Sequence, residues 1–115
     1  MIKCLQTEGN MDIRVVFCTI DKLEGAKEIA RKVVDKKLAA CVNIVPRICS
    51  VYQWQGEIVE DDEYLLIIKT RESLMDSLKD CITKIHTYDV PEIISLEVKE
   101  GADSYIKWVY DSTGN

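Results

Sequence analysis

The stretch ACVNIVPRICSVYQWQGEIVEDDEYLLIIKT, residues 40–70, decides the fold. It contains two long runs of β-branched, aromatic and aliphatic residues, 40–54 and 57–70, separated by Gln55-Gly56, and this pattern predicts a β-hairpin. At about 3.3 Å per residue the first run would span on the order of 45–50 Å, whereas a usual strand is about 17–20 Å long. The hairpin must therefore bend, bulge or extend beyond the domain. Pro46 cannot donate a ladder hydrogen bond, so it marks a bulge or an edge.

An extended hairpin of this kind has consequences for assembly. Its tip carries Tyr52 and Trp54, and such an apolar arm would aggregate unless another subunit covered it. The sequence therefore predicts an oligomer whose subunits pair through β-strands. The acidic run at 60–63 is interpreted as a solvated bend in the hairpin, because the spacing of an EF-hand calcium loop is absent.

The segments on either side of the hairpin complete an α+β pattern. Residues 13–19 predict a strand that is covered on both faces, and residues 92–98 predict a strand with one wet face. Apolar residues at helical spacing predict helices over 22–37 and 72–86, the first with Asp21 and Glu24 as a capping box, and a short terminal helix over 102–110. The order β-α-β-β-α-β plus a C-terminal helix predicts a ferredoxin-like fold, with four strands and helices on one face.

Length and charge exclude several classes of protein. The 115 residues fit one domain, expected over 12–115 after a flexible lead-in at 1–11. The net charge of −5 argues against a sequence-independent nucleic-acid binder, which needs a basic face, and against an anionic membrane surface as partner. No apolar run approaches the roughly 18 residues of a membrane span, so membrane insertion is not expected.

The cysteines indicate a reducing compartment. There are five of them, an odd number, with no CxxC spacing and no apolar signal-peptide core at the start of the chain. We therefore expect a cytoplasmic protein whose thiols are either buried small hydrophobes or soft-metal ligands.

Several short motifs follow one another in a specific order: LAACVN at 38–43, Pro46, SVYQWQG at 50–56, Lys69-Thr70, and YDVPE at 88–92. This order resembles the CutA divalent-cation tolerance proteins over most of the chain. The resemblance implies homotrimers of ferredoxin-like subunits paired through intersubunit strands, with a fold similar to the PII signalling proteins. It also implies tolerance of copper and other divalent metals, and it brings no enzymatic reaction, so we do not expect an enzyme.

The same resemblance implies candidate metal ligands, namely Cys18, Cys41, Cys81, His86 and Glu92. The residues themselves leave alternatives open. Cys81 falls on the apolar stripe of its helix, which favours core packing, whereas Cys18 and Cys41 fit a core and a ligand role equally well. His86, the only histidine, is either a cation at a helix C-terminus or a ligand for copper or another divalent metal ion.

A second group of candidates contains Tyr52, Trp54, Lys69 and Tyr88, read as a small-ligand pocket or a trimer interface. The leading hypothesis is a cytoplasmic homotrimer that binds divalent metal ions, copper in particular, in metal tolerance. The alternative is a PII-like scaffold or signalling module that binds a small ligand or a protein partner, with metal binding incidental.

Overall fold

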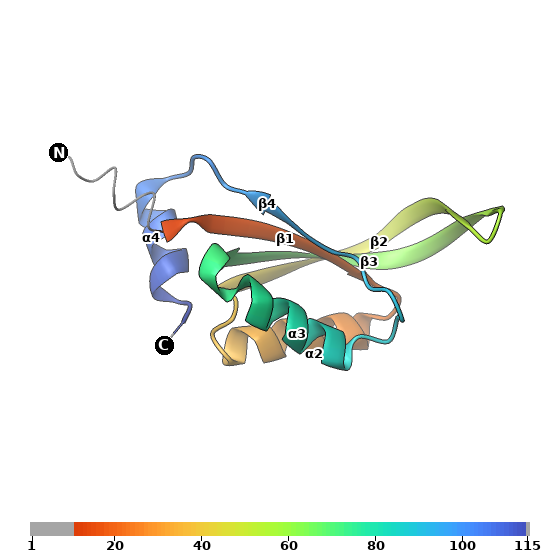
Figure 1. The fold of residues 1–115 in the computed structure, drawn as a ribbon, viewed down its shortest axis with the longest axis horizontal. Helices are drawn as coiled ribbons and strands as arrows, with labels where there is room; N and C mark the ends of the chain where they lie inside the picture. The colour runs from red at the N-terminus through yellow and green to blue at the C-terminus, as the bar shows by residue number, and fades with distance from the viewer. Residues whose placement is uncertain (1–10, 115) are drawn as a thin grey trace.

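Four antiparallel strands form one sheet in the order β2-β3-β1-β4 (Figure 1). The computed structural model describes residues 11–114, so the predicted lead-in lies outside the described residues except for its last position. The strands are β1 (Ile13–Ile20), β2 (Cys41–Trp54), β3 (Glu57–Arg71) and β4 (Ile93–Glu97). This arrangement confirms the predicted α+β class, the ferredoxin-like order of elements and the long hairpin.

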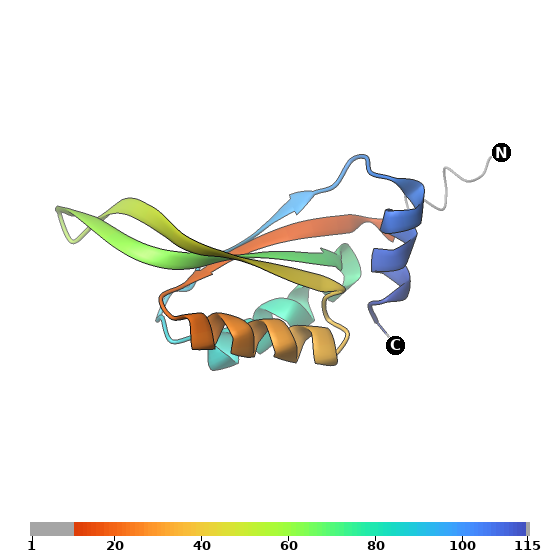
Figure 2. The ribbon, with the colours of Figure 1, turned by 180° about the vertical axis from the view of Figure 1, so that it is seen from behind.

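The helices are α2 (Leu23–Asp35), α3 (Met75–Ile85) and α4 (Asp103–Asp111), with a 3₁₀ turn at Glu72–Leu74 before α3. Helices α2 and α3 lie on one face of the sheet, and α4 lies at the end of the sheet opposite the hairpin tip (Figures 1 and 2). The predicted capping box is wrong: α2 begins one residue later than expected, and Lys22, without a side-chain cap, holds the N-cap position. None of the helices within 11–114 is long and apolar enough to cross a membrane.

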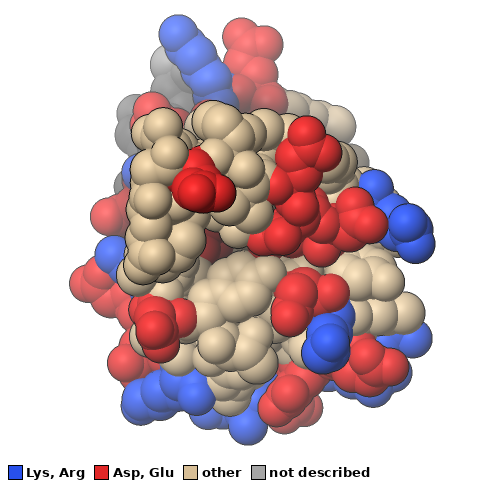
Figure 3. Space-filling view, turned by 90° about the vertical axis from the view of Figure 1, so that its right-hand side faces the viewer, with Lys and Arg blue, Asp and Glu red and all other residues tan. Residues whose placement is uncertain are grey.

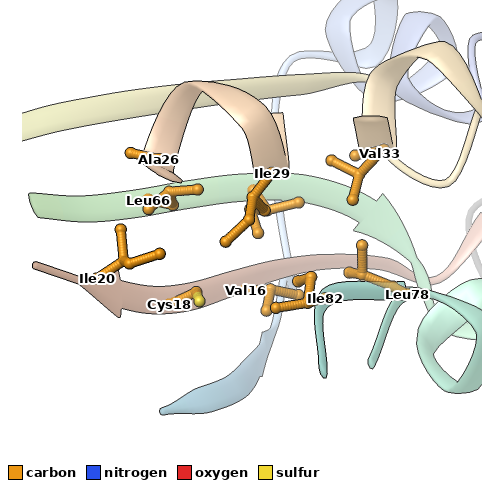
Figure 4. Close-up of a cluster of buried hydrophobic side chains, with 11 residues drawn as sticks. Val16, Cys18, Ile20, Ala26, Ile29, Val33, Leu66, Leu78 and Ile82 are labelled. Carbon is orange, nitrogen blue, oxygen red and sulfur yellow. The ribbon is translucent and has the colours of Figure 1, made fainter. Parts of the chain in front are cut away.

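The core lies between the sheet and the two helices (Figure 4). Alternate residues of β1 point into it, because successive strand side chains point to opposite faces. Helix α2 contributes residues at the helical spacing that its sequence predicts. The fully buried members include Val16, Cys18, Ile20, Ala26, Ile29, Val33, Leu66, Ile68, Leu78 and Ile82.

The opposite face of the sheet is also apolar, but α2 and α3 do not cover it. The residues that alternate with the core set include Phe17 in β1 and Ile67 in β3, which pair with each other. Next to them in β4, Ile94 is 52% and Leu96 48% exposed. The solvent-exposed face predicted for the last strand thus carries its apolar side chains. Covering on both faces was predicted for β1, but α2 and α3 cover only one of them.

Half of the hairpin extends beyond the sheet as a two-stranded arm. Strand β1 pairs with β3 only as far as Ile20 opposite Tyr64, so residues 57–63 of β3 pair with β2 alone. The register of β2 shifts between Val45 and Ile48, which confirms the bulge predicted at Pro46. The acidic run at 60–63 is not the predicted bend but continuous strand, because the extra residues that bend the hairpin lie in β2.

Candidate functional site

A chain of hydrogen bonds joins the loop between α3 and β4 to the arm root, which is the level of Glu63 and Tyr64 where the arm leaves the sheet. The Nε2 atom of His86 lies 2.7 Å from the carbonyl oxygen of Thr19, near the end of β1. The backbone N–H of Tyr88 donates to Nδ1 of His86 at 3.0 Å. The hydroxyl of Tyr88 donates to Glu63 at 2.7 Å. Four residues from three separate segments thus converge on one place.

These contacts determine the state of the His86 ring. Since Nδ1 accepts a hydrogen bond and a carbonyl can only accept, Nε2 carries the proton and donates it to Thr19. Both nitrogens are therefore engaged with main-chain groups. A metal ion could bind His86 only after one of these two hydrogen bonds was broken.

Glu63 is the functional candidate that sequence reasoning missed, since it belonged to the acidic run assigned to solvent. Its residue is only 7% exposed, and Tyr88 is the donor to its carboxylate. Burial raises the pKa of the Tyr88 phenol, and the hydrogen bond to Glu63 and the charges of Glu63, Asp21 and Asp61 raise it further. The strand period did not reveal it, because Glu63 shares its parity with residues 65 and 67, which lie on the sheet face that α2 and α3 leave uncovered.

The two thiols predicted to share a metal do not meet. Cys18 pairs with Leu66 and Cys41 pairs with Lys69, and residues three apart in a strand point to opposite faces. Cys18 is fully buried in the core, where burial, and then the charges of Glu92 and Glu63, raise the pKa of its thiol to about 12. Because the thiolate is the form that binds metals, Cys18 is a poor ligand at neutral pH.

The other candidates are also dispersed. Cys81 is partly buried and packs against the core, as its place in the helical stripe favours. Among residues 11–114, no three His, Cys, Asp or Glu side chains are grouped so that they could hold a metal ion. A complete ligand set therefore does not form within the described part of one chain.

The predicted pocket residues fall into separate places rather than one cluster. Tyr52 donates to Asp61 within the arm, and Trp54 lies at the arm tip, 58% exposed. Lys69 lies at the other end of β3, where its ammonium group donates to Asn43 and approaches the Cys41 sulfur at 3.8 Å. Only Tyr88 belongs to the hydrogen-bonded chain at the arm root.

The arm end of the molecule carries many carboxylates. Figure 3 looks onto this end and shows Asp and Glu side chains grouped beside the arm, with Lys and Arg mainly towards the rim. Four carboxylates raise the pKa of groups near the arm root: Asp21, Asp61 and Glu63 raise that of the half-buried Tyr88, and Glu63 and Glu92 raise that of the buried Cys18. A concentration of negative charge of this kind attracts cations.

The comparison with family models identifies the chain. Residues 14–112 match the model described as CutA1 divalent ion tolerance protein, which includes every described strand except the first residue of β1. The chain belongs to the CutA1 divalent ion tolerance family.

Relatives of this CutA1 chain occur in plants, animals and bacteria. It is 50% identical over 101 residues to "Protein CutA, chloroplastic" of Arabidopsis thaliana, covering 88% of this chain and 56% of that protein. It is 46% identical over 100 residues to the divalent-cation tolerance protein CutA of Thermus thermophilus, covering 87% of this chain and 97% of that protein. The chain thus spans little more than half the length of the plant relative and nearly all of the bacterial one.

Solved CutA1 structures share the fold. The Oryza sativa CutA1 crystal structure matches with a TM-score of 0.87 at 48% identity, covering 90% of this chain and 94% of that chain. The divalent cation tolerance protein of Thermus thermophilus matches with a TM-score of 0.87 at 45% identity, covering 89% of this chain and 99% of that chain. The ferredoxin-like architecture with its long hairpin is therefore shared with these CutA1 proteins.

Proposed function

We propose that this CutA1-family protein binds divalent metal ions, copper among them, and serves in tolerance of those ions. The carboxylates at the arm root carry the proposal: the charges of Asp21, Asp61, Glu63 and Glu92 act on the half-buried Tyr88 or on the buried Cys18. Together with the net charge of −5, they provide a negative potential that concentrates cations at this end of the molecule. The family description, CutA1 divalent ion tolerance protein, and the name of the Thermus thermophilus relative refer to the same class of ion.

We further propose that the working form is a homotrimer. The uncovered sheet face exposes Ile94 and Leu96, and the arm exposes Val51 (61%), Trp54 (58%) and Ile58 (70%). Strands β2 and β4 lie at the two edges of the sheet, where unpaired backbone groups can accept a strand from a neighbour. Both features favour an assembly in which each subunit covers the apolar face of another.

In that assembly an ion would be held at a subunit boundary. Of the predicted ligands, Glu92 is exposed beside the start of β4, and Cys41 lies partly exposed on the uncovered sheet face at the end of β2 away from the arm root. Both can therefore meet donors from a second subunit. Cys18, Cys81 and His86 do not have this freedom, because two thiols pack in or against the core and the imidazole uses both nitrogens.

The proposal includes no catalysis and a cytoplasmic location, the latter because of the odd number of cysteines. The second candidate is a PII-like scaffold that binds a small ligand or a protein partner. It is favoured by the dispersion of the candidate metal ligands within residues 11–114 of one chain.

Calorimetry with light scattering separates the two. Saturable Cu²⁺ or Zn²⁺ binding, with a stoichiometry fixed per trimer and lost in Cys41→Ala/Glu92→Gln, supports the metal function. Matched controls are Cys49→Ala and Glu97→Gln, which change a thiol in the arm and a carboxylate at the far end of β4. Binding that is equal in all variants, or that never saturates, would favour the scaffold.

A further inference from the structure

The arm leaves the sheet where β1 stops pairing with β3 and where the register of β2 shifts. The pairing of β1 with β3 stops at Tyr64, and Glu63 is the first residue of β3 that pairs with β2 alone. Directly opposite, β2 contains the bulge at Pro46 and Arg47, and Arg47 has a φ of 56°, in the left-handed region that favours glycine. An isolated two-stranded ribbon is only marginally stable, so the pairing of β2 with β3 alone does not fix the direction of the arm beyond this point.

Among the described residues, one side-chain hydrogen bond joins the arm root to a residue outside the hairpin. The other polar contacts of the arm among residues 11–114, Tyr52 with Asp61 and Arg47 with Asp62, join the two arm strands to each other. The hydroxyl of Tyr88 instead joins Glu63 to the loop between α3 and β4. It is therefore the polar link between the arm root and the helical layer.

Tyr88 is itself held in place by the body of the domain. The backbone N–H of His86 donates to Ile82 at the end of α3, and the His86 ring donates to Thr19 in β1. The same ring accepts the backbone N–H of Tyr88 and packs edge-on against the Tyr88 ring, with centroids 4.7 Å apart. The phenol is thus presented to Glu63 from a fixed position.

Glu63 needs this donor. Its residue is 7% exposed, and a buried carboxylate that loses its hydrogen-bond partner is left with the cost of its desolvation. A turn of the arm at the bulge that carried Glu63 away from Tyr88 would break this bond and leave the carboxylate without its donor.

We propose that Tyr88 is a brace for the hairpin arm, whose hydrogen bond to Glu63 sets the direction of the arm at the bulge of β2. The α3–β4 loop thereby controls how the apolar arm is presented, and release of the loop frees the arm. This device does not depend on metal binding, so it stands or falls separately from the proposed metal function. In the proposed trimer it would orient the arm towards the neighbouring subunit.

Hydrogen exchange read by mass spectrometry on the full chain tests the brace. Tyr88→Phe removes one oxygen, and we expect amides of the arm and its root, residues 46–63, to exchange about ten-fold faster, which corresponds to about 1.4 kcal/mol. Amides in α2 and in the paired part of β1 should keep their wild-type protection. Tyr52→Phe is the matched control: it also removes a tyrosine hydroxyl bonded to a carboxylate, but that bond stays within the arm.

Two further variants keep the test decisive. Glu63→Leu removes the acceptor and should produce the same local increase if Tyr88→Phe does not fold. The double variant should exchange no faster at the root than either single one, because both remove the same bond. Unchanged exchange of residues 46–63 in Tyr88→Phe, an increase spread equally over the whole sheet, or additive effects in the double variant would each overturn the brace.

Discussion

Substitution of Cys18 distinguishes a core thiol from a metal ligand. The side chain is fully buried between the sheet and the helices, and its sulfur is the only side-chain atom that Cys18→Ala removes. Loss of one buried heavy atom, as in Ile→Val, costs about 0.5–1.5 kcal/mol from lost burial and the remaining cavity. For a chain of 115 residues this corresponds to a fall in Tm of roughly 2–6 °C.

Cys18→Ser gives a second, independent magnitude. The hydroxyl would be buried where the present thiol has only a long 3.9 Å contact, to the carbonyl oxygen of Thr19. A buried hydroxyl without a good partner costs about 1–3 kcal/mol, so Ser should destabilise the protein more than Ala although it is closer in shape to Cys.

The assay combines thermal unfolding at one protein concentration with copper titration of the folded protein. We expect the Tm order wild type, then Ala, then Ser, with the copper affinity the same in all three. Cys41→Ala serves as the control, because that thiol lies on the opposite face of the sheet. An affinity that drops ten-fold or more in Cys18→Ala while the Tm stays unchanged would refute the assignment of this thiol to the core.

Three further outcomes follow from the structure. Trp54→Ala should shift the light-scattering mass from three chains towards one while the helical circular dichroism persists; a fully trimeric variant would show that the arm tip is not at an interface. His86→Ala should leave copper affinity unchanged between about pH 5.5 and 7.5, because both ring nitrogens are already hydrogen-bonded; a lost pH dependence in the variant would instead identify the ring as a ligand. The raised pKa of Tyr88 contributes stability that is fully present below pH about 10 and is lost as the pH rises through the folded-state pKa. The difference in unfolding free energy between wild type and Tyr88→Phe should therefore shrink above pH about 10, and a constant difference up to pH 12 would contradict this.

The fold was predictable because its signals are local. The length of the two apolar runs around Gln55-Gly56 predicts a hairpin too long for a small sheet, and Pro46 predicts where its ladder is interrupted. Helical spacing in 22–37 predicts which face of α2 is buried. Each of these inferences uses residues within a few positions of one another, where steric and periodic constraints act directly.

The site was not predictable in the same way. Tyr88 and Glu63 are 25 positions apart, and Thr19 and His86 are 67 apart, so their contacts follow from how the loop and the arm root pack. The charge of Glu63 favours solvent on composition alone, and only its partner in the folded chain explains its burial. Spacing likewise gave no reason to separate Cys18 from Cys41, because the separation depends on the register of two strand pairs.

The same register links assembly to any metal chemistry of this protein. Strand parity sends Cys18 to the face that the chain covers with its own helices, and Cys41 to the face that α2 and α3 leave open. A donor on the covered face is desolvated and kept protonated, whereas a donor on the open face stays incomplete until another surface arrives. In the proposed trimer, a ligand set that includes Cys41 depends on subunit contacts, so its metal affinity should fall when dilution dissociates the assembly. Copper titrations at concentrations above and below the dissociation midpoint should differ for this reason, and equal affinity in monomer and assembly would place the ligands within one chain.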